Sequence, residues 1–432
     1  MRSTAISRER RRPLDHTLGR TLAGALVACA VGGPATAADW PSELGPVLSW
    51  TPPAGAADPG RCSRIVDRDR EPGASIQAAV DAAGPGEMVC VRSTDHRDEV
   101  VALRNSGEPG RPLELQALGE VVTGGFVVAA DDIVVRGFTV ETGAAADAED
   151  WRAGFALRGR RLGIIDNTVT DPAGYGIHCS LGAPHCTDTA IIGNTITGAD
   201  GNGINAIGYD LLVEGNDVSG SIRRYANDAD GIRFFGERLL LRDNIVHRIF
   251  DRGYAGEGPH TDCFQNFDSG RPSTRDVVIE DNVCFDVDHQ CLIAETPVRR
   301  EGADLVFRRN ICANNGSQGV MVREFDGLLV EENVFLSTIY FNAVVLRQEV
   351  SDATIRCNLV VGRPALHEID RSSRQGLRIT GNQRTDSPAA APAARAALAK
   401  GGCNLPPLSP WLQESVILVG ELNGDTNGGS RP

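Results

Sequence analysis

Lysine is almost absent from this chain of 432 residues. Of its 43 basic residues, only Lys400, close to the C-terminus, is a lysine. This excludes mechanisms that need a lysine base or nucleophile in the body of the protein. Aromatic residues make up only 5%, so the core must be mainly aliphatic. The 41% hydrophobic and 23% charged residues exclude a disordered or collagen-like chain.

The sequence also lacks an apolar run long enough to cross a bilayer. Residues 1–37 have a basic start, a short apolar segment from Thr21 to Gly33 and Ala35-Thr36-Ala37, which fits an A-x-A cleavage site. This pattern predicts a secretory signal peptide and a secreted, extracellular protein. Removing its six arginines and two acidic residues changes the formal net charge from −14 to −18. That charge argues against a nucleic-acid partner and suits divalent cations, a neutral substrate, or a substrate held locally by arginine.

No C-x-x-C pair is present, which disfavours a zinc ribbon. Beyond Cys29 in the signal segment, ten cysteines remain, and an even number in an exported chain favours disulfides.

The most informative feature is a repeat marked by asparagine, with spacings between 22 and 38 residues. The repeated asparagines are Asn167, Asn194, Asn216, Asn244, Asn282, Asn310, Asn333, Asn358 and Asn382. Each follows a short apolar run and is followed by one to three residues with apolar alternation, as in Leu240–Val246. Short β-rich units of this period predict an all-β solenoid in which like residues stack about 4.8 Å apart.

A second repeated frame predicts which side chains face inward. Its second position is always apolar: Phe155, Ile177, Ile204, Ile232, Phe264, Leu292, Val320 and Val344. Since side chains alternate along a strand, the third position should face outward. The third position holds Ala156, His178, Asn205, Arg233, Gln265, Ile293, Met321 and Val345, and is polar only in the middle. We therefore expect a binding groove on the outer face of the coils from 176 to 323.

The ends of the solenoid have different compositions. Residues 75–83 have helical spacing after a serine, and Met88–Val91 follows as the expected first strand. We predict an N-terminal segment at 38–61, the solenoid at 62–384, and a C-terminal cap with a loose tail at 385–432. A helix at one end of a solenoid covers an otherwise open core.

The capping helix, the first strand with its cysteine and the Asn-marked coils resemble the pectin-lyase-like superfamily. The resemblance covers about residues 62–384 and implies a single-stranded right-handed parallel β-helix. It implies lyases, hydrolases, epimerases and non-catalytic binders alike. The lysine base of several lyase families has no counterpart here. The paired-Asp and Gly-His-Gly signature of polygalacturonase-like hydrolases is also missing.

The candidate catalytic residues are Asp230, Arg233, His260 and Asp262, in the longest excursions of the repeat. Asp230 and Asp262 fall in one column of the alignment, which continues with amides at Asn202, Gln290, Gln318 and Asn342. Two carboxylates about 5 Å apart repel, so one takes up a proton or a cation bridges them. Calcium held by Asp228, Asp230 and Asp262 is one hypothesis; an amide-like structural column is the other.

Two reactions fit these residues. In β-elimination from a uronic acid, His260, Arg233 or His178 would be the base, and arginine or calcium would neutralise the substrate carboxylate. In a glycoside hydrolase, Asp230 and Asp262 would be the acid and the base.

Further residues are candidates for substrate binding. These are His178, Asn205, Gln265, Asp288, His289 and Arg323. Asp286 accompanies Asp288 and His289, and Arg323 shares a strand position with Glu295 and Arg347, which predicts an ion-pair ladder or a clamp for an acidic sugar. Tyr225, Phe235, Tyr254 and Phe267 could stack on sugar rings.

The leading functional hypothesis is a monomeric, secreted lyase or epimerase acting on a uronic-acid polysaccharide. A glycoside hydrolase and a non-catalytic carbohydrate-binding solenoid remain alternatives.

The alignment also predicts disulfides. Cys263 with Cys291 and Cys284 with Cys312 share columns, at a spacing within disulfide range. The other predicted pairs are Cys62 with Cys90, Cys179 with Cys186, and Cys357 with Cys403.

Overall fold

The computed structural model describes residues 48–53, 59–92, 94–141, 153–179, 182, 184–224, 228–267, 273–296, 302–313, 315–337 and 342–406. All of them belong to one compact unit, Glu43–Pro432. The predicted signal peptide, Tyr225 and the tail from residue 407 lie outside the described residues. Within those ranges, no helix combines the length and the hydrophobicity that a membrane crossing requires.

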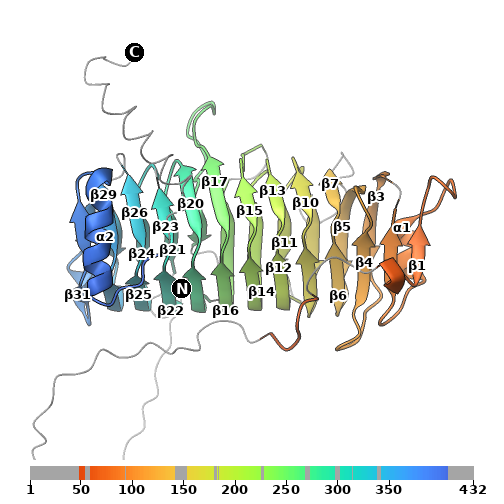
Figure 1. Cartoon of the computed structure of the whole chain (residues 1–432), viewed down its shortest axis with the longest axis horizontal. Coiled ribbons are helices and arrows are strands. Elements are labelled where there is room, and N and C mark those ends of the chain that lie inside the picture. The colour runs from red at the N-terminus through yellow and green to blue at the C-terminus, as the bar shows by residue number, and fades with distance from the viewer. Residues whose placement is uncertain are drawn as a thin grey trace, which may run out of the picture. The chain divides into compact units, whose positions relative to one another are not determined.

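The strands form three parallel ladders, in which each strand pairs with its counterpart in the next coil (Figure 1). The first ladder contains β3 (Asp95–Leu103), β5 (Val122–Ala129), β8 (Phe155–Arg158), β11 (Ile177–Cys179), β14 (Ile204–Glu214), β16 (Ile232–Arg242), β18 (Phe264–Asn266), β21 (Leu292–Glu295), β24 (Val320–Arg323), β27 (Asn342–Arg347) and β30 (Ala365–Ile369). The long strands β14 and β16 bend and continue into the second ladder.

The second ladder otherwise contains β1 (Arg64–Val66), β2 (Met88–Val91), β4 (Leu113–Ala117), β6 (Ile133–Arg136), β9 (Leu162–Ile165), β12 (Cys186–Ile192), β19 (Arg275–Glu280), β22 (Gly302–Arg308), β25 (Phe325–Glu331), β28 (Ser351–Arg356) and β31 (Arg378–Thr380). The third contains β7 (Thr139–Glu141), β10 (Thr168–Thr170), β13 (Thr195–Thr197), β15 (Asp217–Ser219), β17 (Ile245–Ile249), β20 (Val283–Val287), β23 (Ile311–Ala313), β26 (Val334–Ser337), β29 (Leu359–Gly362) and β32 (Gln383–Thr385). It begins with residues 95–96 of β3, which pair with residues 122–123 of β5, and these pair with β7.

Helices cover parts of the solenoid (Figure 1). In α1 (Ile76–Asp81), the Ser75 side chain caps the first turn, and Ile76 and Val80 join the core, as predicted for the capping helix. The helix α2 (Ala391–Lys400) packs Ala391 and Leu398 on the outer face of the third ladder. Short 3₁₀ turns lie at Pro59–Arg61, Ser372–Arg374 and Pro388–Ala390.

The interior is a continuous apolar column, as the second frame predicts. Ile177, Ile204, Ile232, Phe264 and Leu292 pair in register and are completely buried. The third strand position lies outside this column, since Ile293, Met321 and Val345 form a separate apolar cluster. These outward residues are nevertheless buried, so outward direction and exposure do not coincide in this ladder.

A strap of N-terminal residues crosses the outer face of the second ladder. The backbone N–H of Ser49 and the indole N–H of Trp50 both donate to Asp188, on β12, at 2.8 Å. The Trp50 ring lies against Gly163, where a Cβ atom would come within 3.1 Å of it. Arg136 donates to the carbonyl of Pro53. The strap therefore connects three successive coils.

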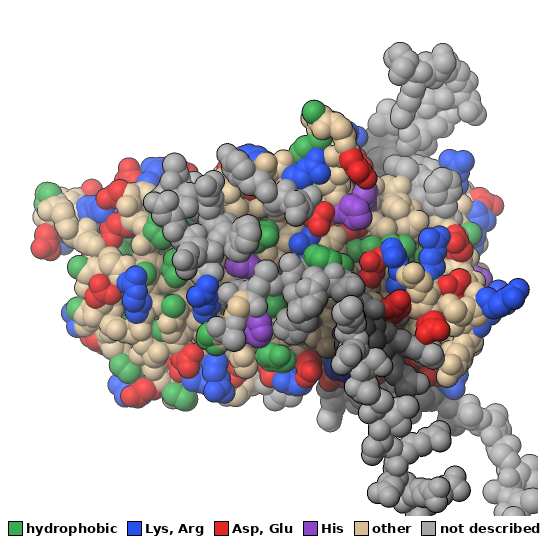
Figure 2. Space-filling view, turned by 180° about the vertical axis from the view of Figure 1, so that it is seen from behind, with side chains coloured by type: hydrophobic (Ala, Val, Ile, Leu, Met, Phe, Trp, Pro, Cys, Tyr) green, Lys and Arg blue, Asp and Glu red, His purple; other side chains and the backbone are tan. Residues whose placement is uncertain are grey.

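Charged side chains of both signs are interspersed on the face shown in Figure 2. Several form ion pairs between adjacent coils, such as Arg161 with Asp132 and Arg238 with Asp210, each at 2.6 Å. Such pairs balance the charge along the stacked turns.

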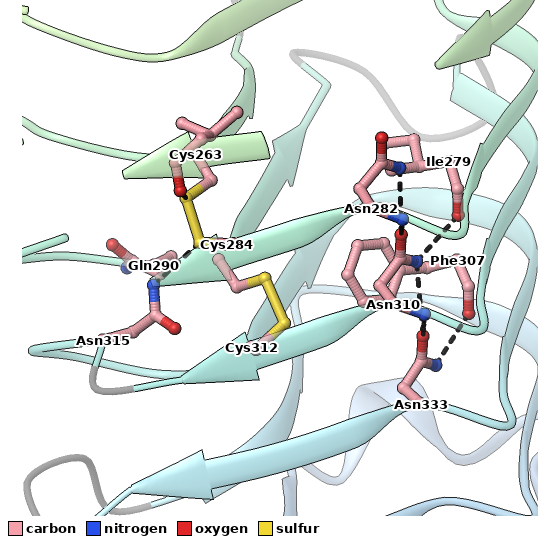
Figure 3. Close-up of a disulfide and its surroundings, with 12 residues drawn as sticks. Cys263, Ile279, Asn282, Cys284, Gln290, Phe307, Asn310, Cys312, Asn315 and Asn333 are labelled. Carbon is pink, nitrogen blue, oxygen red and sulfur yellow. Dashed lines mark hydrogen bonds between the residues drawn. A yellow bond between two sulfur atoms is a disulfide. The ribbon is translucent and has the colours of Figure 1, made fainter. Parts of the chain in front are cut away.

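The repeated asparagines form a buried ladder of their own (Figure 3). The Oδ1 atom of Asn310 accepts the backbone N–H of Asn282 at 3.0 Å and its side-chain amide at 2.9 Å. Asn282 Nδ2 also donates to the carbonyl of Leu241 at 2.9 Å. The residue before each asparagine has a positive φ, as at Gly193 and Asp281, so a left-handed turn directs the amide inward.

The disulfides correct one part of the sequence prediction. Cys263 bonds Cys284, and Cys291 bonds Cys312, each 21 residues apart within one coil (Figure 3). The predicted pairs Cys263–Cys291 and Cys284–Cys312 are wrong. Residues in register on parallel strands point their Cβ atoms the same way, whereas residues facing each other inside one coil converge.

The other three predicted disulfides are present in the structure. They join Cys62 to Cys90, Cys179 to Cys186, and Cys357 to Cys403.

Candidate functional site

A polar column runs along the turn that leads from the third ladder into the first. It comprises Asn202, Asp230, Asp262, Gln290 and Gln318. The Oδ1 atom of Asn202 accepts the backbone N–H of Asp230 at 3.4 Å, and Asp230 Oδ1 accepts that of Asp262 at 3.1 Å. Asp262 Oδ1 in turn accepts the N–H of Gln290 at 2.8 Å. The column thus uses the same kind of side-chain-to-backbone bond as the asparagine ladder, but in the opposite direction along the solenoid and with two carboxylic acids in it.

Asp230 is completely buried within this column. Its second oxygen, Oδ2, accepts a hydrogen bond from the Arg233 guanidinium. Burial raises the pKa of Asp230 from 3.8 to about 6, while Arg233 opposes that rise and Asp228 adds to it. Asp230 is therefore poised between its charged and neutral forms near pH 6.

Asp262 is also completely buried. Its Oδ2 atom accepts from Gln265 Nε2 at 3.0 Å. Burial, followed by the neighbouring carboxylate of Asp230, raises the pKa of Asp262 well above its ordinary value. The two acids are thus placed to share one negative charge, with the proton favoured on Asp262.

Arg233 is held on several sides. It donates to Asp228 at 3.0 Å and to Asp230, and its guanidinium lies 4.8 Å from the centroid of the Phe267 ring. Only 6% of Arg233 is exposed. The guanidinium therefore serves as the counter-charge of the buried acids in this structure.

The aromatic candidates have different surroundings. Phe235 is buried and makes an edge contact with Phe267, so its ring belongs to the core. Tyr254 is partly buried, and its hydroxyl accepts the backbone N–H of Arg223 at 2.9 Å.

His178 and Asn205 extend the polar region toward the N-terminal coils. His178 Nδ1 lies 3.1 Å from Asn205 Nδ2, and Asn202 donates to Asn205 Oδ1 at 2.6 Å. The His178 ring also packs on Tyr175. Both predicted residues are almost fully buried. They lie next to the polar column, as the alignment predicts, but are closed to a large ligand in this structure.

A second group of titratable side chains is accessible. We name His260, His289, Asp251 and Asp288 the His–Asp cluster. The ring centroids of His260 and His289 lie 5.3 Å apart, and His289 Nε2 lies 3.3 Å from Asp251 Oδ2. His260 is exposed, and the side chains of His289 and Asp251 are 27% and 39% exposed.

Asp288 connects this cluster to the loop after β17. Its Oδ2 atom accepts the backbone N–H of Asp251 at 3.1 Å. Burial and the Asp251 carboxyl raise the pKa of Asp288, and the nearby charge of Arg252 lowers it. The His–Asp cluster therefore includes a carboxyl pair and an adjacent, exposed cation, Arg252.

The predicted catalytic residues thus fall into two places. Asp230, Asp262 and Arg233 are joined by hydrogen bonds inside the polar column. The His260 backbone connects to them, since its carbonyl accepts the N–H of Ala229, but its ring packs on His289. Arg323 lies further along the first ladder, paired with Glu295 at 2.5 Å.

The comparisons agree with this architecture. A family model described as a right handed beta helix region matches residues 153–360. The chain is a right-handed parallel β-helix. The fold class predicted from the asparagine repeat and from the family resemblance is therefore confirmed.

Several solved structures are similar to this chain. A tailspike protein of the E. coli bacteriophage HK620, in complex with a pentasaccharide, is 14% identical with a TM-score of 0.51, and the match covers 71% of this chain and 61% of the tailspike. A PL6 family polysaccharide lyase from Pseudopedobacter saltans is 11% identical, with a TM-score of 0.49 and coverage of 80% and 96%. A GH136 lacto-N-biosidase from Eubacterium ramulus is 12% identical, with a TM-score of 0.47 and coverage of 75% and 68%.

At 14% identity, the likeness to the tailspike is one of fold. The β-helix chain spans about three fifths of the length of the tailspike chain. No curated protein matches its sequence significantly.

Calcium is the metal that the sequence suggests for this β-helix, at Asp228, Asp230 and Asp262. Across the described ranges, no three His, Cys, Asp or Glu side chains are grouped as a metal site needs. Both oxygens of Asp230 already accept hydrogen bonds, one from Arg233. The donor set does not fit a cation without displacing Arg233, and calcium stays an untested prediction on which no step below depends.

Sequence reasoning missed Asp251 and Arg252. Both lie in the long excursion between Asn244 and Asn282, which the spacing had singled out. The signal that could have found Asp251 is its place two residues after the end of the β17 strand, one coil before Asp288.

Proposed function

We propose that this β-helix is an extracellular enzyme that cleaves a uronic-acid polysaccharide by β-elimination at the His–Asp cluster. The observation that carries the proposal is the pair of accessible imidazoles, His260 and His289, beside a carboxylate and an exposed arginine. Imidazole exchanges protons near neutral pH, which suits both the acid and the base of such a reaction.

In this proposal, His289 is the base. Asp251 accepts the Nε2 hydrogen of His289, so the lone pair is on Nδ1. Nδ1 removes the proton on the carbon next to the sugar carboxylate. Electrons then form the new carbon–carbon double bond, and the bond to the leaving glycosidic oxygen breaks. Protonated His260 gives its proton to that oxygen.

The negative charge that develops on the sugar carboxylate requires a cation. Arg252 supplies it in this proposal. Its guanidinium is exposed, lies 4.0 Å from the centroid of the Phe250 ring, and is close enough to Asp288 to lower the pKa of that acid. A guanidinium can hold a carboxylate through two parallel hydrogen bonds.

The buried acids have a supporting role in this proposal. Asp230 and Asp262 are fully buried and cannot contact a polymer without rearrangement. Asp228, whose side chain is 27% exposed, joins Arg233 to the surface beside the loop of His260. The network therefore fixes the turns from which the His–Asp cluster projects.

Two further observations support a carbohydrate ligand outside the cell. The five disulfides among the described cysteines are typical of an oxidising compartment. One β-helix of similar fold, the HK620 tailspike, is described in complex with a pentasaccharide.

The test is an assay of the purified protein against uronate polymers and neutral polymers. Ultraviolet absorbance from the unsaturated product identifies elimination, whereas new reducing ends without absorbance identify a hydrolase. Binding without either signal identifies a carbohydrate-binding solenoid.

Variants locate the reaction. His289→Ala and His260→Ala should each lower turnover at least about a hundredfold, the usual contribution of a general acid or base. His367→Ala is the matched control, because His367 is an exposed histidine on β30. Full turnover in both test variants would move the site elsewhere.

A further inference from the structure

Charged residues at the end of the second ladder show how this fold balances charge. Six side chains follow one another in register: Glu214, Arg242, Glu280, Arg308, Glu331 and Arg356. Their signs alternate at every step. Ion pairs of 3.0 Å (Arg242–Glu214), 2.6 Å (Arg308–Glu280) and 2.7 Å (Arg356–Glu331) join them. Opposite charges on adjacent strands attract, so an alternating row stabilises the stacked coils.

The corresponding row on the first ladder breaks this alternation. Glu295 is in register with Arg323, and Arg323 is in register with Arg347. Two arginines therefore occupy adjacent coils, about one strand spacing, or roughly 4.8 Å, apart. Their like charges repel at that separation, so the arrangement does not contribute stability by itself.

Each arginine forms an ion pair with one acid, on the side that faces away from the other arginine. Arg323 Nη2 contacts Glu295 at 2.5 Å, and Arg347 Nη2 contacts Glu368 at 2.7 Å. The buried Nε atom of Arg323 has no hydrogen-bond partner. Since a guanidinium has five donors, both arginines have capacity for another acceptor.

Both guanidinium groups are accessible. The side chains of Arg323 and Arg347 are 36% and 46% exposed. The residues two positions earlier, Met321 and Val345, are buried. The accessible chemistry at this point of the first ladder therefore includes two adjacent guanidinium groups, beside the half-exposed carboxylate of Glu368.

We propose that Arg323 and Arg347 together bind a carboxylate of an acidic polysaccharide, as a subsite separate from the His–Asp cluster. The substrate class rests on the proposed function. One carboxylate can accept hydrogen bonds from both guanidinium groups and replace their mutual repulsion with attraction. A chain with a formal net charge of −14 repels a polyanion, so local cation pairs are needed to hold one.

The test measures binding directly. Six-unit oligomers of galacturonate, mannuronate and guluronate, with cellohexaose as the neutral probe, are titrated into the protein by calorimetry at low and high salt. Arg323→Gln/Arg347→Gln should weaken the binding of the acidic oligomer at least about tenfold, the effect of losing one or two charge-assisted hydrogen bonds. Arg356→Gln removes a similarly exposed arginine from the alternating row and should leave binding unchanged.

The outcomes separate this subsite from the reaction. Binding lost in the double variant, with or without turnover by the wild-type protein, supports the subsite. Unchanged affinity in the double variant overturns the subsite but leaves the elimination at His260 and His289 intact. If the wild-type protein binds none of the acidic oligomers, the subsite proposal is wrong. The proposed elimination is then judged by the separate assay of turnover on uronate polymers.

Discussion

The carboxylate of Asp230 accepts the backbone N–H of Asp262, one coil further along the chain, at 3.1 Å. Asn310 Oδ1 makes the same kind of bond to the backbone N–H of Asn282 in the asparagine ladder, but there the acceptor lies one coil further along the chain. An acid thus occupies a place where an uncharged amide would have the same shape. The effect of the buried acids on the free energy of unfolding, and the stabilisation by Arg233, can be measured separately.

Replacing Asp262 by asparagine should stabilise the protein. Asparagine keeps the acceptor for the Gln290 N–H, and its amide can donate to Gln265 Oε1, a buried oxygen without a partner. Asn202 and Asn205 already form this amide pair in an earlier coil. We expect the free energy of unfolding at pH 8 to rise by about 1–2 kcal/mol, because one buried ionisable group is removed.

Asp230→Asn is the contrasting variant. Asparagine has one acceptor oxygen for the two donors that Asp230 serves, Arg233 and the Asp262 N–H, so one buried donor loses its partner and unfolding should become easier by roughly 1–3 kcal/mol. Urea denaturation of both variants measures the difference. Equal destabilisation by the two substitutions would contradict the idea that Arg233 serves Asp230 in particular.

The same acids predict a dependence of stability on pH. A carboxyl whose pKa is higher in the folded than in the unfolded protein binds its proton more tightly when folded. The stabilisation is then fully present below the unfolded value and is lost as pH rises through the folded value. For Asp230 this window runs from 3.8 to about 6, and Asp262 extends it upward.

We therefore expect the urea midpoint to fall between about pH 5 and pH 8. Asp243, Asp288 and Asp304 have raised pKa values and act in the same direction. Glu99, whose pKa is lowered, acts in the opposite direction as pH falls below its ordinary value of 4.5, so the measurement stays above that pH. If the urea midpoint of Asp262→Asn depends on pH as strongly as that of the wild-type protein, groups other than Asp262 cause the dependence.

Chelation tests the calcium hypothesis. Since Arg233 already supplies the counter-charge of Asp230, we expect EDTA to leave the melting temperature unchanged. The control is a titration with calcium after dialysis. A rise of several degrees that disappears in Asp228→Asn would establish a calcium site at these acids.

Disulfide mapping checks the pairing inside the coils. Cleavage after Phe285 separates Cys284 from Cys291, which no arginine does. Mass spectrometry of the unreduced digest should then find Cys263 with Cys284 and Cys291 with Cys312. Peptides joining Cys263 to Cys291 would instead support the pairs predicted from the sequence alignment and contradict the pairs in the structure.

The sequence predicts the fold well because a solenoid repeats its constraints. The spacing of Asn167, Asn194 and Asn216 reflects a turn that each coil must make, and the column of Ile177, Ile204 and Ile232 reflects the shared interior. Errors in one coil are corrected by the others. The register of the first ladder can therefore be obtained by aligning short segments.

The site follows less directly, because it depends on features that do not repeat. Alternation along a strand predicts that Arg233 points outward, but not that it is 94% buried beneath neighbouring groups such as Phe267. The contact between His260 and His289 joins two long turns whose paths are set by their own loop residues. The wrong cysteine pairs have the same origin. A shared column in the sequence alignment predicts that two residues lie close together, but it does not predict the direction of their Cβ atoms.

The strap at Ser49 and Trp50 has a consequence for the order of events during synthesis. Its partner Asp188 is 139 residues further along the chain than Ser49. When the strap leaves the ribosome, its binding surface on β12 does not yet exist, and it must wait while the first coils form. The Trp50 indole can therefore dock against Gly163 and Asp188 only after residues up to β12 have been synthesised. The N-terminal coils are completed at that late step.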